Sequence, residues 1–351
     1  MVPGLTHRKW GQHIHRHQTW WKFSKPYFDY VARCQFLLQQ GRTVADFAYL
    51  YHEGAPLNIK DYSMSLERPP GYDYDLCAAE LIQKMEARDG RIHLPSGVSY
   101  RYLVLPKSGA LTLQTAQKLE ELRKAGAAIV QQVQVTGTPG LKDYPKADEA
   151  VQNLAKNWPM LPEDGWNAIL AKDNLKPDFV GDDLHWIHRR CGGDDIFFVA
   201  NSTLETIERP CTFRVAGKTP ELWNPETGEV FALRNTRQTD GRTSVLLKFE
   251  PSQSWFIVFR DQPSTQIAAG SSFPSWKTIQ KISGDWNVTF DPKWGKDEPL
   301  VFDTLDSWSE HSDPQVKYYS GTGVYQTTFD FPKSNVLDDD APLYLDLGRS
   351  I

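Results

Sequence analysis

The sequence predicts a multidomain chain in which an α/β part is followed by all-β parts. Apolar strand-like segments alternate with helical segments between residues 25 and 165, and short aromatic and β-branched segments separated by turn formers fill residues 185–261. Alternating strands and helices are typical of a doubly wound parallel sheet. Short strands at regular spacing are typical of a β-sandwich. With 351 residues, the chain is long enough for several hydrophobic cores.

The α/β part is predicted from its periodicity. Apolar residues recur at helical spacing in four segments: 26–40, 74–85, 112–125 and 147–157. Short, almost wholly apolar segments predict buried strands at 44–51, 102–105 and 127–130. A hairpin is expected from residues 91–94 and 99–101, and a short helix at 166–172 within a mixed connector.

The all-β part is predicted from four apolar segments: IFFVAN, CTFRV, TSVLLKF and WFIVF. Asp240-Gly241 between polar flanks indicates a two-residue hairpin turn. Residues 262–279 are rich in small and polar residues and read as a linker. Beyond the linker, strand-like segments occupy 281–290, 300–302, 323–331 and 343–347. A sandwich of this kind needs about eight strands, so the chain is expected to stop inside this domain.

Composition narrows the classes of function. Hydrophobic content of 40% and charged content of 24% are those of a soluble globular protein. The net charge of -5 disfavours a nucleic-acid partner. No apolar run is long enough for a membrane span, and the N-terminus lacks the apolar region of a signal peptide. The 12 Trp and 14 Tyr are compatible with stacking on sugars, although packing accounts for most of them.

Several motifs carry a family resemblance. They are WGQHIHRHQTWW, YVARCQFLLQQG, GYDYDLCAAE, IFFVAN with PELWNPETGEV and SWFIVF, WNVTFDPKWG, and YYSGTGVYQTTF. They occur in the same order as in the α-L-rhamnosidases of glycoside hydrolase family 106 and cover nearly the whole chain. The chain resembles the middle and C-terminal part of a much longer enzyme, which implies a fragment lacking most of the catalytic barrel.

The resemblance implies a domain assignment for each segment. Residues 1–24 resemble the tail of a catalytic (β/α) barrel, and 25–165 an amidotransferase-like, flavodoxin-like α/β domain. A connector (166–184), a β-sandwich (185–261), a linker (262–279) and an incomplete galactose-binding-like jelly roll (280–351) follow. The implied activity is inverting hydrolysis of terminal α-L-rhamnosyl residues from a polysaccharide or glycoside, in the periplasm or outside the cell. The alternative is a non-catalytic carbohydrate-binding accessory module.

No catalytic pair can be assigned from the residues. Glycoside hydrolysis needs two carboxyl groups flanking the bond, and the family resemblance places both glutamates on the barrel, upstream of Met1. Within this chain, Asp73, Asp75 and Glu80 are substrate-side candidates, with a helix N-cap as the alternative role of Asp75. Glu53 and Asp61 follow the first strand, where α/β folds bind ligands. For both, exposed loop charge is the favoured alternative.

The N-terminal segment supplies aromatic candidates. The resemblance places Trp10, His13, Trp20 and Trp21 near the mouth of the barrel, where Trp can stack on a sugar and His can bond a hydroxyl. Packing beneath the barrel is an equally weighted alternative. His13, His15 and His17 would lie on one face of an extended segment, but no acidic or cysteine partner is near, so no metal site is predicted. No cofactor is evident, and calcium is left open.

The cysteines and one polar cluster complete the candidates. An amidotransferase nucleophile would need a glycine-flanked elbow, whereas Cys77 lies in a helical pattern, so that activity is rejected. Cys34 and Cys77 are predicted to be buried thiols, and a disulfide between Cys191 and Cys211 is left open.

His185, Trp186, His188 and Arg189 are clustered on the first strand of the all-β part. Strand alternation places His188 with Trp186 and opposite to Arg189. Packing at a domain interface is favoured over sugar contact for this cluster.

Overall fold

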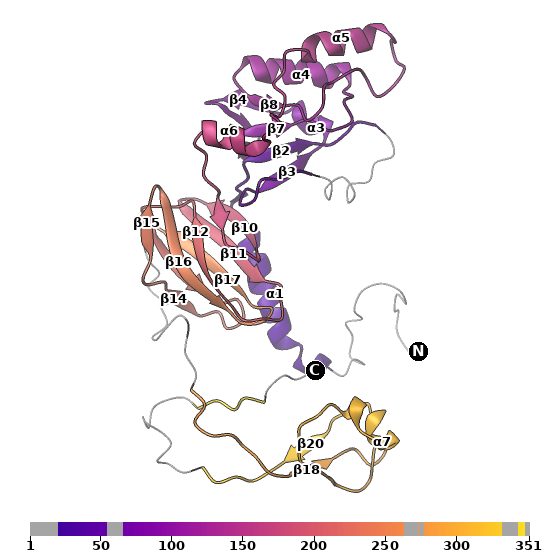
Figure 1. Cartoon of the computed structure of the whole chain (residues 1–351), viewed down its shortest axis with the longest axis vertical. Helices are drawn as coiled ribbons and strands as arrows, with labels where there is room; N and C mark the ends of the chain where they lie inside the picture. The colour runs from indigo at the N-terminus through magenta and orange to yellow at the C-terminus, as the bar shows by residue number, and fades with distance from the viewer. Residues whose placement is uncertain (1–19, 55–65, 263–272, 274–276, 332–342, 348–351) are drawn as a thin grey trace. The chain divides into compact units, whose positions relative to one another are not determined.

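The computed structural model describes residues 20–54, 66–262, 273, 277–331 and 343–347 (Figure 1). The chain divides into two compact units, one formed by Lys25–Phe273 and the other by Met1–Ser24 with Pro274–Ile351. Several sheets and few helices make up the described parts of the chain. No helix in the described ranges combines the length and the apolar character that crossing a membrane requires.

A four-stranded parallel sheet lies in the larger unit. Its strands run in the order β3 (Tyr74–Cys77), β2 (Phe47–Leu50), β7 (Tyr102–Val104) and β8 (Ala128–Val130). One face packs against α4 (Leu113–Lys124) and α5 (Lys146–Ala155), and the other packs against α6 (Trp166–Lys172) (Figure 1). Because helices cover both faces, the two central strands β2 and β7 are apolar and buried along their whole length. The predicted strands at 44–51, 102–105 and 127–130 and the helices at 112–125, 147–157 and 166–172 all form.

The predicted helix at 74–85 is wrong. Tyr74–Cys77 is strand β3, which pairs in parallel with Phe47–Leu50, and only Ala79–Ile82 (α3) is helical. A short apolar segment fits strand and helix periodicity alike, and here the hydrogen-bonding partner β2 decides. The predicted hairpin forms from β5 (Arg91–His93) and β6 (Ser99–Tyr100), and β4 (Glu86–Arg88) extends it.

Two antiparallel sheets form the rest of the larger unit. One has six strands: β1 (Arg42–Thr43), β10 (Leu184–Cys191), β11 (Asp194–Asn201), β17 (Ser254–Arg260), β13 (Thr219–Trp223) and β14 (Val230–Ala232). The other has four: β15 (Arg237–Thr239), β16 (Arg242–Phe249), β12 (Ile207–Phe213) and β9 (Phe179–Val180). Both contribute to one hydrophobic core that includes Phe197, Phe213, Phe249 and Phe259.

The predicted hairpin turn at Asp240-Gly241 joins β15 to β16. Thr239 and Arg242 are paired across it, and Asp240 and Gly241 have φ values of 53° and 72°. Two consecutive residues with positive φ match the twist of the flanking strands. The turn residues therefore set the register of this hairpin.

Helix α1 (Lys25–Leu38) forms as predicted but packs on the six-stranded sheet. Its Cys34 is buried together with Ile196, Phe256 and Val258. The predicted domain 25–165 groups this helix with the parallel sheet instead. After residues 39–41 the helix is followed by β1, which pairs with β10 and keeps the segment beside the antiparallel sheet.

The smaller unit has a three-stranded antiparallel sheet in its described part. Its elements are η1 (Trp21–Phe23), β18 (Trp286–Thr289), β19 (Leu300–Phe302), η2 (Trp308–Glu310), α7 (Pro314–Lys317) and β20 (Val324–Gln326). Val288, Phe290, Phe302, Val316 and Tyr319 form its core. The segments predicted at 281–290, 300–302 and 323–331 each contain one strand, whereas 343–347 contains none. Its four apolar side chains are all more than half exposed, so no burial favours a strand there.

Candidate functional site

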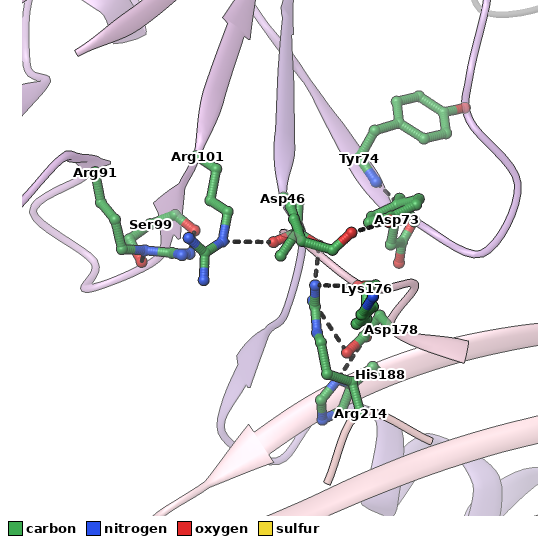
Figure 2. Close-up of polar contacts among 12 residues, drawn as sticks. Asp46, Asp73, Tyr74, Arg91, Ser99, Arg101, Lys176, Asp178, His188 and Arg214 are labelled. Atoms are coloured by element: carbon green, nitrogen blue, oxygen red, sulfur yellow. Dashed lines mark hydrogen bonds and ion pairs between the residues drawn. The ribbon is translucent and has the colours of Figure 1, made fainter. Parts of the chain in front are cut away.

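A group of buried charges lies where the parallel sheet meets the antiparallel sheets of the larger unit. We call it the charged junction and define it by Asp46, Asp178, His188 and Arg214, which Figure 2 labels, together with Asp195. Arg214 Nη2 donates to Asp46 Oδ2 at 2.7 Å and lies 3.2 Å from Asp178 Oδ1. Asp46 directly precedes β2 and Asp178 directly precedes β9. Arg214 therefore ties the parallel sheet to the four-stranded antiparallel sheet.

His188 lies between two carboxylates. Its Nδ1 is 2.7 Å from Asp178 Oδ2 and its Nε2 is 3.1 Å from Asp195 Oδ1, and the ring stacks on Phe197 at 3.8 Å. Burial lowers the pKa of His188, but the bonds to the two aspartates outweigh burial and raise it above its ordinary value. His188 has no exposed surface, so it cannot contact a sugar directly.

Asp195 is held by cations as well as by His188. Lys218 Nζ lies 2.6 Å from its Oδ2, and Arg190 Nε donates to its Oδ1 at 2.7 Å. Burial raises the pKa of Asp195, but the bonds from His188 and Lys218 outweigh burial and hold the pKa well below its usual range. A buried charge is tolerated only when it is paired in this way.

The strand register of β10 explains how these side chains are positioned. Trp186 and His188 face the core and Arg189 faces the opposite side, as alternation predicts. Arg189 donates to Gln40 O at 2.6 Å and to Gly41 O at 3.0 Å, which fixes the chain after α1. His185 is exposed on the same strand. The cluster therefore connects elements of the larger unit by packing and hydrogen bonding.

Asp73 lies next to the charged junction (Figure 2). Its Oδ1 accepts a hydrogen bond from Tyr74 N at 2.8 Å, and its backbone carbonyl accepts from Asp46 N at 3.2 Å. Burial, with the nearby negative charges of Asp75 and Asp178, raises the pKa of Asp73 to about 6. A carboxyl group with such a pKa can hold a proton close to neutral pH, which a general acid requires.

The other acidic candidates have separate surroundings. Asp75 lies within β3 and accepts a hydrogen bond from Tyr100 OH at 2.8 Å, so its predicted alternative as a helix N-cap is wrong. Glu80 is exposed on α3. Both lie within the larger unit, but only Asp73 of the three is adjacent to the charged junction.

Glu53 caps a helix. Its Oε2 accepts from Thr112 N at 2.7 Å, and its Oε1 accepts from Thr112 Oγ1 at 2.8 Å and Thr115 Oγ1 at 2.9 Å. Thr112 is the N-cap residue of α4. The expectation of exposed loop charge is therefore wrong, because this carboxylate occupies the helix N-terminus at the carboxyl end of β2. Asp61 lies outside the described residues.

The N-terminal candidates belong to the smaller unit. Trp20 directly precedes η1, and Trp21 begins it with 39% of its surface exposed. Trp10 and His13 lie outside the described residues, as do His15 and His17. In the described part of the chain, no group of three or more His, Cys, Asp or Glu residues could hold a metal ion.

The cysteines are free thiols. Cys191 and Cys211 form no disulfide, and neither do Cys34 and Cys77. Cys77 ends strand β3 and does not lie in a helix as predicted. Burial raises the pKa of its thiol to about 12. A nucleophilic cysteine needs a lowered pKa. The raised pKa of Cys77 therefore supports the rejection of an amidotransferase activity, although the predicted helix is wrong.

A shallow cavity of about 360 Å³ lies beside the charged junction, between residues 69–72 and α6. Pro69, Tyr72 and Leu170 are among its apolar lining residues, and Asn174 and Lys176 are among the polar ones. The carbonyl of Lys176 accepts a hydrogen bond from Arg214 Nη1 at 2.8 Å, which links the cavity wall to the junction.

Sequence reasoning missed Asp46, Asp178, Asp195 and Arg214. A signal was present, because Asp46 in VADFAYLY is a lone charge within an apolar strand segment. Such a charge is seldom buried without a partner. The partner itself could not be read from the sequence, since Arg214 is 168 residues away.

Comparison with known proteins identifies the family. The model of the glycoside hydrolase 106 alpha-L-rhamnosidases matches residues 1–237 of the chain. This chain belongs to glycoside hydrolase family 106. A putative beta-glucuronidase of Formosa agariphila is 32% identical over 271 residues, which are 74% of this chain and 23% of that protein. The structure resembles a rhamnosidase from Novosphingobium sp. PP1Y with a TM-score of 0.72 and 26% identity, covering 92% of this chain and 33% of that one.

The family 106 chain described here thus spans about a quarter of the matched curated relative and a third of the matched solved structure. The recognition of this family from sequence motifs is confirmed.

Proposed function

We propose that this chain is part of an enzyme that removes terminal α-L-rhamnosyl residues from a polysaccharide or glycoside. The family match over residues 1–237 carries this proposal, and the likeness to the Novosphingobium rhamnosidase supports it. The substrate would be met in the periplasm or outside the cell, where polysaccharides are degraded. The mechanism would be inverting: one carboxylic acid protonates the leaving oxygen while a carboxylate activates a water molecule on the opposite face of the sugar.

We further propose that the catalytic acid and base come from a barrel domain outside this sequence. Inversion requires two carboxyl groups roughly 6.5–9.5 Å apart with room for water between them. The buried carboxylates of the charged junction are engaged in ion pairs, Glu53 caps α4, and Asp75 accepts from Tyr100. The role of this chain would then be to support the barrel, with Trp10, His13, Trp20 and Trp21 on the substrate side.

Two other functions are supported by particular observations. The relative at 32% identity is called a putative beta-glucuronidase, which favours a glucuronosyl substrate. The cavity lined by Tyr72, Asn174 and Lys176 favours a non-catalytic carbohydrate-binding module. An apolar floor with a few polar groups is typical of sites for small ligands.

A substrate panel separates these functions. The purified 351-residue chain is incubated with p-nitrophenyl α-L-rhamnopyranoside and with p-nitrophenyl β-D-glucuronide, each with added calcium and with a chelator. The anomer of any released sugar is followed by proton NMR. Because the acid and base are proposed to lie outside this sequence, no turnover of either compound by this chain is expected. Initial release of β-L-rhamnose would support the inverting rhamnosidase but refute that placement, and Asp73→Asn and Glu80→Gln would then be the first variants to assay.

Each other outcome is equally informative. Turnover of the glucuronide alone would replace the proposed substrate. If a folded sample turns over neither compound, binding of L-rhamnose is measured by calorimetry for the wild type and for Tyr72→Ala. Binding that is lost in the variant would support the accessory module.

A further inference from the structure

We propose that His188, held as an imidazolium between Asp178 and Asp195, is a pH-sensitive latch that keeps the parallel sheet docked on the antiparallel sheets. Removing its proton at alkaline pH would loosen this contact. The inference concerns a conformational property of the larger unit and does not depend on which glycoside the enzyme cleaves.

The hydrogen-bonding geometry of the ring favours a protonated His188. Each ring nitrogen faces a carboxylate oxygen, at 2.7 Å and 3.1 Å. A neutral imidazole has one N–H and can donate to one carboxylate only. Its other nitrogen would then face an oxygen lone pair across a hydrogen-bond distance. The imidazolium donates to both, and because the ring has no exposed surface, water cannot replace either bond.

The charged groups around the ring make Asp178 depend on the proton of His188 more than Asp195 does. The acidic groups are Asp178 before β9, Asp195 on β11, Asp46 before β2, and Asp73 before β3. The basic groups are Arg214 after β12, Lys218 before β13, Arg190 on β10, and Arg101 before β7. Asp195 retains Lys218 and Arg190 when His188 loses its proton. Among the side chains that the structure describes, Asp178 retains only Arg214, which it shares with Asp46.

Asp178 connects the His188 ring to the parallel sheet. Its Oδ1 pairs with the same Arg214 nitrogen that donates to Asp46, directly before β2. Its backbone N–H donates to Gly71 O at 2.8 Å, and its carbonyl accepts from Arg214 N at 2.9 Å. A movement of Asp178 away from a neutral His188 would therefore disturb Arg214, Asp46 and the residue 71 turn together.

The direction of the pH effect follows from the ring's pKa, which is raised in the folded chain. A raised histidine pKa stabilises the fold fully below the ordinary value near 6.5, and this stabilisation is lost as the pH rises through the folded value. Asp195, whose pKa is lowered, stays charged over this whole range. The junction is expected to be firm at neutral and mildly acidic pH and to loosen at alkaline pH.

The protonation state is measured directly by NMR of the wild-type chain with ring-labelled histidine. The His188 resonance is assigned by its loss in His188→Gln, or in Asp178→Asn if the first variant does not fold. We expect His188 to remain doubly protonated above pH 6.5, the ordinary histidine value. A ring that titrates at or below pH 6.5 would overturn the proposal.

The opening of the junction is measured by hydrogen exchange with mass spectrometry between pH 6.5 and 9.5. Peptides containing β2 and β9 are followed, and rates are corrected for intrinsic base catalysis. Between the ordinary histidine value near pH 6.5 and the raised pKa of the ring, the opening equilibrium should grow about tenfold per pH unit in the wild type and then level off. No such rise should occur in His188→Gln. His185→Gln, on the same strand but exposed, is the matched control and should behave as the wild type. A wild-type rise that persists unchanged in His188→Gln would refute the latch.

Discussion

Replacing Glu53 tests whether a half-buried carboxylate holds the parallel sheet to α4. Glu53 follows β2, and its two oxygens accept three hydrogen bonds from Thr112 and Thr115 at the start of the helix. Helix α4 buries Ala116, Leu119 and Leu122 against the sheet. Loss of the cap should therefore weaken both the helix end and the packing of its first turns.

The magnitude can be worked from these contacts. A hydrogen bond to a charged acceptor contributes about 1.5–3 kcal/mol net, and a negative charge at a helix N-terminus contributes about 0.3–1 kcal/mol. Glu53→Gln keeps one acceptor oxygen but loses the charge, so we expect a loss of about 1–2 kcal/mol in the free energy of unfolding. Glu53→Ala leaves the Thr112 N–H and two hydroxyl groups without this acceptor, so we expect about 2–4 kcal/mol.

The assay is thermal and urea unfolding followed by tryptophan fluorescence, with hydrogen exchange of the peptide that contains α4. For a unit of this size, 1 kcal/mol corresponds to about 2–4 °C in Tm, so Glu53→Ala should lower Tm by about 4–16 °C. Glu80→Gln, an exposed glutamate on α3, is the control and should change Tm by less than about 2 °C. If Glu53→Ala and Glu80→Gln unfold alike, Glu53 is not a structural cap and the contact carries no stability.

Two further predictions concern the charged junction and the turn beside it. The pKa of Asp73 is about 6, against an ordinary 3.8; because it is raised in the folded state, stability falls as pH rises from about 4 to 6. Asp73→Asn should therefore stabilise the chain at pH 7.5 by up to about 3 kcal/mol and flatten this part of the pH–stability curve, and an unchanged curve would contradict the burial of this carboxyl group. Gly71 has a φ of 80°, and a Cβ there would lie 2.4 Å from Phe179 O. Gly241 has a similar φ of 72°, but a Cβ there would meet nothing within 4 Å. Gly71→Ala should therefore lower Tm far more than Gly241→Ala. Equal melting temperatures for these two variants would show that the 71 turn is not packed against β9.

Much of the local structure could be predicted because its causes are local. The apolar strands at 44–51, 102–105 and 127–130, helix 166–172 and the Asp240-Gly241 turn depend on side chains within a few residues of one another. The family could also be recognised from short motifs along the chain. Hydrophobic periodicity, turn-forming residues and the order of motifs can all be recognised in the sequence without knowledge of tertiary contacts.

Other features were decided by contacts between distant residues. Tyr74–Cys77 is a strand because β2 pairs with it, and α1 lies on the six-stranded sheet because Cys34 is buried with residues of β11 and β17. Glu53 became a helix cap through Thr112, 59 residues away.

The charged junction could not be read from the sequence for the same reason. Its pairs join Asp46 to Arg214 and His188 to Asp178 and Asp195. The sequence does not show which partner a charged side chain pairs with in the folded chain. Only the packed sheets exclude water from these groups, and this exclusion makes each charge depend on the others and shifts their pKa values.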